Sequence, residues 1–166
     1  SVMTVRGSHD PVPVRGIQRI LVPIDFYQPG LAALSFACGL ARLYDARLDL
    51  IHVLGELLSP AFLAVGSTRI IDLHPEILSD AEDEMERLSQ EPGACRGLNV
   101  EPFAVEGHPG REIVRFADDH DTDLIVMATH GQGKLRNFLL GGTAEKVIAS
   151  AGCPVLVVRG RGEAPE

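Results

Sequence analysis

The chain has 166 residues, a length that suits one domain and is short for two. Apolar residues make up 45% of it and the mean hydropathy is +0.11, so the sequence holds enough apolar material for one buried core and is not disordered throughout. The formal net charge of -8 repels polyanions, and the absence of Trp removes the usual platform for stacking bases. Together these features argue against a protein that coats nucleic acid.

The two ends of the chain differ in composition from its middle. Residues 1–16 and 161–166 mix Gly, Pro and charged residues without a period, so we expect tails, the first of them disordered, around one domain at 17–160. No apolar run approaches the roughly 20 residues that cross a bilayer, and the first residues lack the apolar core of a signal peptide. We therefore expect a soluble, cytoplasmic protein without membrane contacts.

The three cysteines are far apart and have no partner at metal-ligand spacing. We expect Cys38, Cys95 and Cys153 to be reduced thiols, with Cys38 packing on the inner side of a helix.

Apolar patterning in the middle of the chain switches between short continuous runs and a helical period. The helical stripe after Pro29 comprises Leu34, Ala37, Cys38, Ala41 and Tyr44. Strands are expected over 19–25, 47–54, 100–105, 123–128 and 154–158, with helices after Pro29, from Pro75 to about Gln90, after Gly110 and from near Thr143. Strands separated by helices are parallel, and right-handed crossovers place helices on both faces. The pattern predicts a single doubly wound α/β domain.

Ligands of such sheets bind at the carboxyl ends of the strands, where the winding direction reverses. The strands ending at Asp25 and Ala128 are the most continuously apolar, so we expect them to lie side by side in the centre of the sheet. The predicted site lies between Asp25 and the glycine-rich loop that follows Ala128. The irregular stretch from Gly55 to His74 follows another strand end and could form a lid over this site.

Glycine-rich turns and a helix start are the features that could hold an anion. Backbone N–H groups near Gly131 and at Gly141-Gly142-Thr143 could converge on an oxyanion, with Lys134 and Arg136 adding positive charge. The alternative is that these glycines only make turns.

Known catalytic and phosphate-binding motifs are absent. Leu135 stands where a Walker motif needs Ser or Thr, and the turn after Asp25 lacks GxGxxG. No nucleophile has a base at fixed spacing. His52 is interpreted as a strand-packing residue, and His130 as a loop residue able to touch a ligand. An enzyme therefore has little direct support.

Three stretches, 19–25, 32–52 and IVMATHGQGKLRNFLLGGTAEKVIASAGCPVLVV, resemble the universal stress protein family. The resemblance covers nearly everything from Ile20 to Val158. It implies a five-stranded parallel sheet of order 3-2-1-4-5, a cytoplasmic location, a role in the stress response and, usually, a homodimer. One branch of that family binds ATP through a G-two-G-nine-G pattern followed by Ser or Thr.

The resemblance also implies a set of nucleotide-binding positions. Asp25 would meet the adenosine, and Val53 would supply backbone contacts. The base pocket would be lined by Pro23, Ile24 and Met127. The glycine pattern falls on Ala128, Gly131, Gly141 and Gly142, with Thr143 one residue later. The implied cofactor is ATP, AMP or another adenine nucleotide, accompanied by a divalent cation such as magnesium, and no metal is expected to bind to protein side chains alone.

Two departures from the pattern lead us to expect weakened nucleotide binding. Ala128 adds a methyl group where the backbone approaches the nucleotide, and any positive φ there would be costly. Gly142 removes a hydroxyl whose hydrogen bond to a phosphate is worth roughly 1.5–3 kcal/mol. The first alternative is a nucleotide-free dimeric stress protein that acts through protein–protein contacts. The second is a very slow ATPase in which Asp25 or His130 orients a water.

The resemblance places the last strand at an edge of the sheet. Val155 to Val158 would then expose an apolar row and unpaired backbone groups, which invites association. We expect a homodimer through the edge from Pro154 to Arg159, the alternative being that the C-terminal tail covers this edge.

Overall fold

A computed structural model describes residues 2–4, 16–55, 74–91, 95–128 and 141–158. Its sheet has six strands in the order β1-β6-β5-β2-β3-β4. The strands are β1 (Val2–Thr4), β2 (Arg19–Pro23), β3 (Arg47–Leu54), β4 (Val100–Glu106), β5 (Leu124–Ala128) and β6 (Val155–Val158). The helices are α1 (Gln28–Tyr44), α4 (Glu76–Gln90), α5 (Pro109–Asp119) and α6 (Gly142–Ser150).

The predicted fold is confirmed. The strands β2 to β6 are parallel and, numbered by themselves in chain order, lie in the order 3-2-1-4-5. As expected, β2 and β5 are central neighbours, with Leu21 beside Ile125. The chain winds from β2 through β3 to β4 on one side and from β5 to β6 on the other. The switch point therefore lies between the carboxyl ends of β2 and β5.

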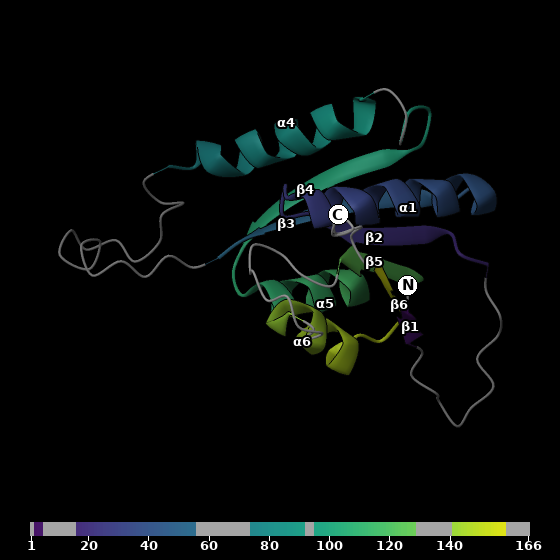
Figure 1. Cartoon of the computed structure of the whole chain (residues 1–166). Helices are drawn as coiled ribbons and strands as arrows, with labels where there is room; N and C mark the ends of the chain where they lie inside the picture. The colour runs from purple at the N-terminus through teal and green to yellow at the C-terminus, as the bar shows by residue number, and fades with distance from the viewer. Residues whose placement is uncertain (1, 5–15, 56–73, 92–94, 129–140, 159–166) are drawn as a thin grey trace, which may run out of the picture.

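Helices cover both faces of the sheet, with α1 and α4 on one side and α5 and α6 on the other (Figure 1). Alternate residues of the central strands enter opposite cores. Val22 packs with the α1 side and Leu21 with the α5 and α6 side. Both are fully buried, which is why the pattern of β2 is continuously apolar rather than alternating.

The inner stripe of α1 is as predicted up to its last member. Leu34, Ala37, Cys38 and Ala41 are buried, whereas Tyr44 is 48% exposed. Asp45 adopts a left-handed conformation with φ of 53° and ends the helix. The chain then turns inward, so Ala46 takes the buried position that the helical period assigned to Tyr44.

The expectation of reduced thiols is wrong for two of the cysteines. Cys38 of α1 and Cys95 form a disulfide, with Cα atoms 5.2 Å apart. Both residues are buried in the same core. Cys153 is the free cysteine. Folding brings α1 and the turn before β4 together although the two residues are 57 positions apart in sequence.

The expectation of an uncovered last strand is also wrong. The strand β1, from the segment expected to be a disordered tail, pairs antiparallel with β6. The β6 side chains do not form an exposed apolar row, because Val155, Val157 and Val158 are buried. Three residues of the N-terminal segment cover this edge, pairing with Val155, Leu156 and Val157 of β6.

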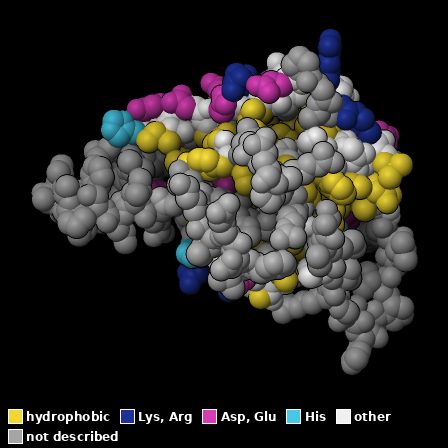
Figure 2. Space-filling view, viewed as in Figure 1, with side chains coloured by type: hydrophobic (Ala, Val, Ile, Leu, Met, Phe, Trp, Pro, Cys, Tyr) yellow, Lys and Arg dark blue, Asp and Glu magenta, His cyan; other side chains and the backbone are white. Residues whose placement is uncertain are grey.

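Acidic side chains gather over α4, along the top of the molecule in Figure 2. Glu76, Asp80, Asp83 and Glu86 are exposed, as expected for a solvated helix face. Arg87 pairs with Glu84 on the same helix. Within the described ranges, no helix combines the length and the apolar character needed to cross a membrane.

Candidate functional site

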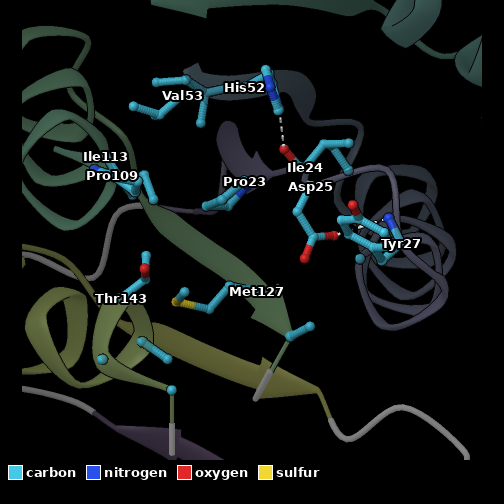
Figure 3. Close-up of a pocket in the computed structure, with 16 residues that line it drawn as sticks. Pro23, Ile24, Asp25, Tyr27, His52, Val53, Pro109, Ile113, Met127 and Thr143 are labelled. Carbon is cyan, nitrogen blue, oxygen red and sulfur yellow. Dashed lines mark hydrogen bonds between the residues drawn. The ribbon is translucent and has the colours of Figure 1, made fainter. Parts of the chain in front are cut away.

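A cavity of about 450 Å³ opens at the switch point, within the size range of small-molecule sites. It is bounded by the ends of β2, β3 and β5 and by the starts of α1, α5 and α6 (Figure 3). All the predicted site residues within the described ranges line it. They are Pro23, Ile24, Asp25, Val53, Met127, Ala128, Gly141, Gly142 and Thr143. Gly131, His130, Lys134 and Arg136 lie outside the described residues, as does 56–73 of the predicted lid.

Asp25 is held by the turn between β2 and α1. Its Oδ1 accepts a hydrogen bond from the backbone N–H of Tyr27 at 3.2 Å. Gly30 in the first turn of α1 lies so close that a Cβ added to it would be 2.5 Å from the same oxygen. The glycine therefore lets the carboxylate lie against the helix start, where the backbone N–H groups favour negative charge. In Figure 3 the carboxylate faces the same space as Met127 and Thr143.

His52 secures the other side of this turn. Its Nδ1 lies 2.8 Å from the carbonyl oxygen of Ile24. A carbonyl only accepts, so Nδ1 is the donor of this hydrogen bond. The imidazole also packs on Phe26, with ring centroids 4.7 Å apart. Phe26 has a φ of 61°, a costly conformation for a non-glycine residue, and these contacts help to hold it.

The start of α6 supplies hydrogen-bond donors to the cavity. Gly141 is the N-cap, and among the described residues no side chain caps the helix. The first N–H groups of a helix have no partner inside it. Gly141, Gly142, Thr143 and Ala144 all line the cavity, so these groups are placed at its wall. A Cβ on Gly142 would meet no atom of the described residues within 4 Å, so these residues leave room for a larger side chain.

The end of β5 forms the floor. Met127 is buried and contributes its side chain to the cavity wall. Ala128 is the last residue of the strand and does not have a positive φ. The anticipated backbone penalty at Ala128 is therefore absent, and only its methyl group distinguishes it from glycine.

Several lining residues were not predicted, namely Tyr27, Gly30, Ile51, His52, Pro109, Ile113 and Ala144. Pro109 and Ile113 belong to α5, whose N-terminus lies at the same edge of the sheet as those of α1 and α6. That signal was present in the sequence, because every helix following a parallel strand starts at the carboxyl edge. His52 was interpreted as a packing residue. It also lines the cavity and holds the Ile24 carbonyl, and its position next to the predicted site residue Val53 could have indicated this.

The cavity combines one carboxylate with the N-termini of three helices. Asp25 is the charged side chain among its described lining residues. Three helix N-termini meet there, and each carries a partial positive charge of roughly half an elementary unit. A ligand with a hydroxyl-bearing part near Asp25 and an anionic part near α6 matches this distribution.

Residues 16–159 match the model of the universal stress protein family, and the chain belongs to that family. Universal stress protein MJ0531 of Methanocaldococcus jannaschii is 35% identical over 143 residues, which cover 86% of this chain and 82% of that protein. Among solved structures, hypothetical protein MJ0577 has a TM-score of 0.74 at 31% identity, covering 90% of this chain and 100% of that one.

A third relative carries a ligand. The structure of the universal stress protein from Archaeoglobus fulgidus in complex with dAMP has a TM-score of 0.54 at 25% identity. The match covers 86% of this chain and 98% of that one. At least one relative of this fold therefore binds an adenine nucleotide.

Proposed function

We propose that this chain is a regulatory module of the stress response that binds an adenine nucleotide in the switch-point cavity. The observation that carries the proposal is the meeting of the Asp25 carboxylate with the start of α6, which no side chain in the described ranges caps, around one cavity. A nucleotide needs both, because its ribose offers hydroxyl donors and its phosphates are anionic. The dAMP complex of the relative from Archaeoglobus fulgidus supports this ligand class.

Each part of the ligand has a counterpart in the wall. Asp25 can accept from ribose hydroxyls, and Pro23, Ile24 and Met127 offer an apolar surface to the base. The end of β3 at Val53 provides backbone groups for the base edge. The N–H groups of Gly142 and Thr143, with the Thr143 hydroxyl, suit a phosphate. A magnesium ion would supply charge neutralisation at the phosphates when ATP is the ligand.

Binding is expected to be weak, because Gly142 lacks a hydroxyl at the position where the family pattern has Ser or Thr. The function is then sensing of nucleotide level rather than turnover. We also propose a cytoplasmic homodimer that uses the edge from Pro154 to Arg159. Since β1 occupies the β6 part of this edge, dimerisation there requires β1 to be displaced.

Isothermal titration calorimetry with ATP and magnesium tests the nucleotide proposal. We expect the wild type to release heat on binding nucleotide at one site. Asp25→Asn should lower the affinity about tenfold, because it loses a charge-assisted hydrogen bond. Asp83→Asn makes the same charge change on the exposed face of α4 and is expected to bind like the wild type.

The absence of Trp and the presence of only 2 Tyr offer a second readout, because copurified adenine would dominate the ultraviolet spectrum. No heat with ATP, ADP or AMP, together with a nucleotide-free spectrum, would refute the proposal and favour the nucleotide-free alternative.

A further inference from the structure

The edge strand β6 is completed by a strand from the other end of the chain. Val2 pairs with Val157, Met3 with Leu156 and Thr4 with Val155, all antiparallel. The remaining side of β6 is parallel to β5. Thus β6 lies between the central strand β5 and the three-residue edge strand β1.

The hydrogen-bonding direction of β6 follows from one contact with β5. The N–H of Ile125 donates to the carbonyl of Pro154 at 3.0 Å. Backbone groups alternate in direction along a strand, so those of Val155 and Val157 point away from β5 and toward β1. The Thr4 hydroxyl donates to the carbonyl of Val155 at 3.4 Å, which shows that this carbonyl faces β1.

The same alternation identifies which residues of β1 hold it in place. Val2 and Thr4 stand opposite Val157 and Val155, so their backbone groups face β6. Those of Met3 point to the outer side. A proline is tolerated in an edge strand where its missing N–H faces outward and breaks the ladder where it faces inward.

The edge that β1 covers is complementary to itself. If a second β6 lay antiparallel across a two-fold axis, Val155 of one copy would stand opposite Val157 of the other, and Leu156 opposite Leu156. Each copy would present the backbone groups that the other needs. In this geometry β1 occupies the place of a second β6, with Val2, Met3 and Thr4 at the positions that Val155, Leu156 and Val157 of the second copy would take.

The contact made by β1 is a short one. It has three residues, and its side-chain hydrogen bond to β6 at 3.4 Å is long. A strand of three residues at the edge of a sheet opens locally at far lower free energy than the central strands.

We propose that β1 is a removable cover of the β6 edge, and that the uncovered edge pairs with β6 of a second copy. This inference rests on the homodimer of the proposed function and adds to it an intramolecular competitor. The dimer then forms only from molecules in which β1 has left, so β1 raises the dissociation constant of the dimer. Anything that captures the N-terminal segment would promote dimerisation.

Two full-length variants test this competition. Val2→Pro/Thr4→Pro removes the inward-facing N–H groups of β1, whereas Met3→Pro introduces a proline whose missing N–H faces outward. Sedimentation velocity over a range of concentrations gives the dimer dissociation constant of each. Hydrogen exchange of the Val155 and Val157 amides reports whether the edge is covered.

We expect the double variant to dimerise at least tenfold more tightly than the wild type and Met3→Pro. Its Val155 and Val157 amides should exchange fast at high dilution and become protected as the dimer forms. Equal dissociation constants in all three proteins, polydisperse aggregation of the double variant, or amides that stay protected in its monomer would overturn the inference.

The experiment distinguishes failure of the proposed homodimer from failure of the proposed competition by β1. A wild-type dimer as tight as that of the double variant leaves the homodimer standing and removes β1 as its competitor. Monomers of every variant at every concentration remove the homodimer itself. Nucleotide binding is measured separately by calorimetry and is not affected by either result.

Discussion

The Nδ1 atom of His52 donates a hydrogen bond to the carbonyl of Ile24 across 2.8 Å, joining the ends of β3 and β2 at the mouth of the cavity. This bond and the packing of the imidazole on Phe26 fix the turn that carries Asp25. The geometry of a ligand-facing carboxylate is thereby set by a residue on the neighbouring strand.

Replacing His52 should separate the hydrogen bond from the ring packing. Both His52→Asn and His52→Leu lose the ring, but the Asn amide can still donate to Ile24. We expect His52→Leu to be less stable than His52→Asn by about 1 kcal/mol and to bind nucleotide more weakly. Urea denaturation and calorimetry give the two quantities. Identical stability and affinity in the two variants would show that the bond does not hold the turn.

Two glycines of α1 should respond differently to replacement by alanine. A Cβ at Gly39 would meet no atom within 4 Å in the described part of the chain, so Gly39→Ala should stabilise the protein by up to about 1 kcal/mol. Alanine at Gly30 would place its Cβ 2.5 Å from Asp25 Oδ1 and push the carboxylate aside. We expect Gly30→Ala to lower nucleotide affinity while Gly39→Ala leaves it unchanged, as measured by calorimetry. Unchanged affinity in Gly30→Ala would argue against a role for the carboxylate.

Restoring a hydroxyl at the start of α6 should strengthen binding. Gly142→Ser adds a donor in open space beside the cavity, and one hydrogen bond to a charged phosphate is worth about tenfold in affinity. Gly142→Ala fills the same space without a hydroxyl and serves as the matched control. Competition against a fluorescent ATP analogue gives both affinities, and equal values for Ser and Ala would place the phosphate elsewhere.

The central pairing of β2 with β5 was predictable because buried parallel strands leave continuous apolar runs, as in Ile20 to Val22, whereas the full strand order was implied by the family resemblance. The residues around the cavity were predictable for a related reason, since the topology brings Asp25 and Gly141 to one edge. The strand β1 was not predictable, because three residues show no period. The Cys38–Cys95 disulfide was not predictable either, because sequence spacing does not determine which distant cysteines meet.

The disulfide predicts a specific thiol count. Protein purified without reductant and denatured should titrate one thiol, from Cys153, and all 3 cysteines after reduction. The closed loop spans 57 positions, so reduction should lower the free energy of unfolding by about 4 kcal/mol in the chain-entropy picture. Three thiols in the unreduced protein would show that the disulfide does not form.

Cys153 should be unreactive in the folded protein. Burial, with a smaller effect of Asp118, raises the pKa of its thiol to about 11. The reactive thiolate is therefore scarcer than in the unfolded chain at mildly alkaline pH, and alkylation should be about a hundredfold slower. Iodoacetamide labelling followed by mass spectrometry measures this rate in native and denatured samples. Equal rates would contradict the burial of this thiol.

A crystal structure of the protein grown with saturating ATP and magnesium tests the central claim most directly. We expect the nucleotide in the cavity, with its ribose at the Asp25 carboxylate, its base against Met127 and its phosphates at the backbone of Gly142 and Thr143. A cavity that stays empty at saturating ATP, or ATP bound at another surface, would contradict the proposed function.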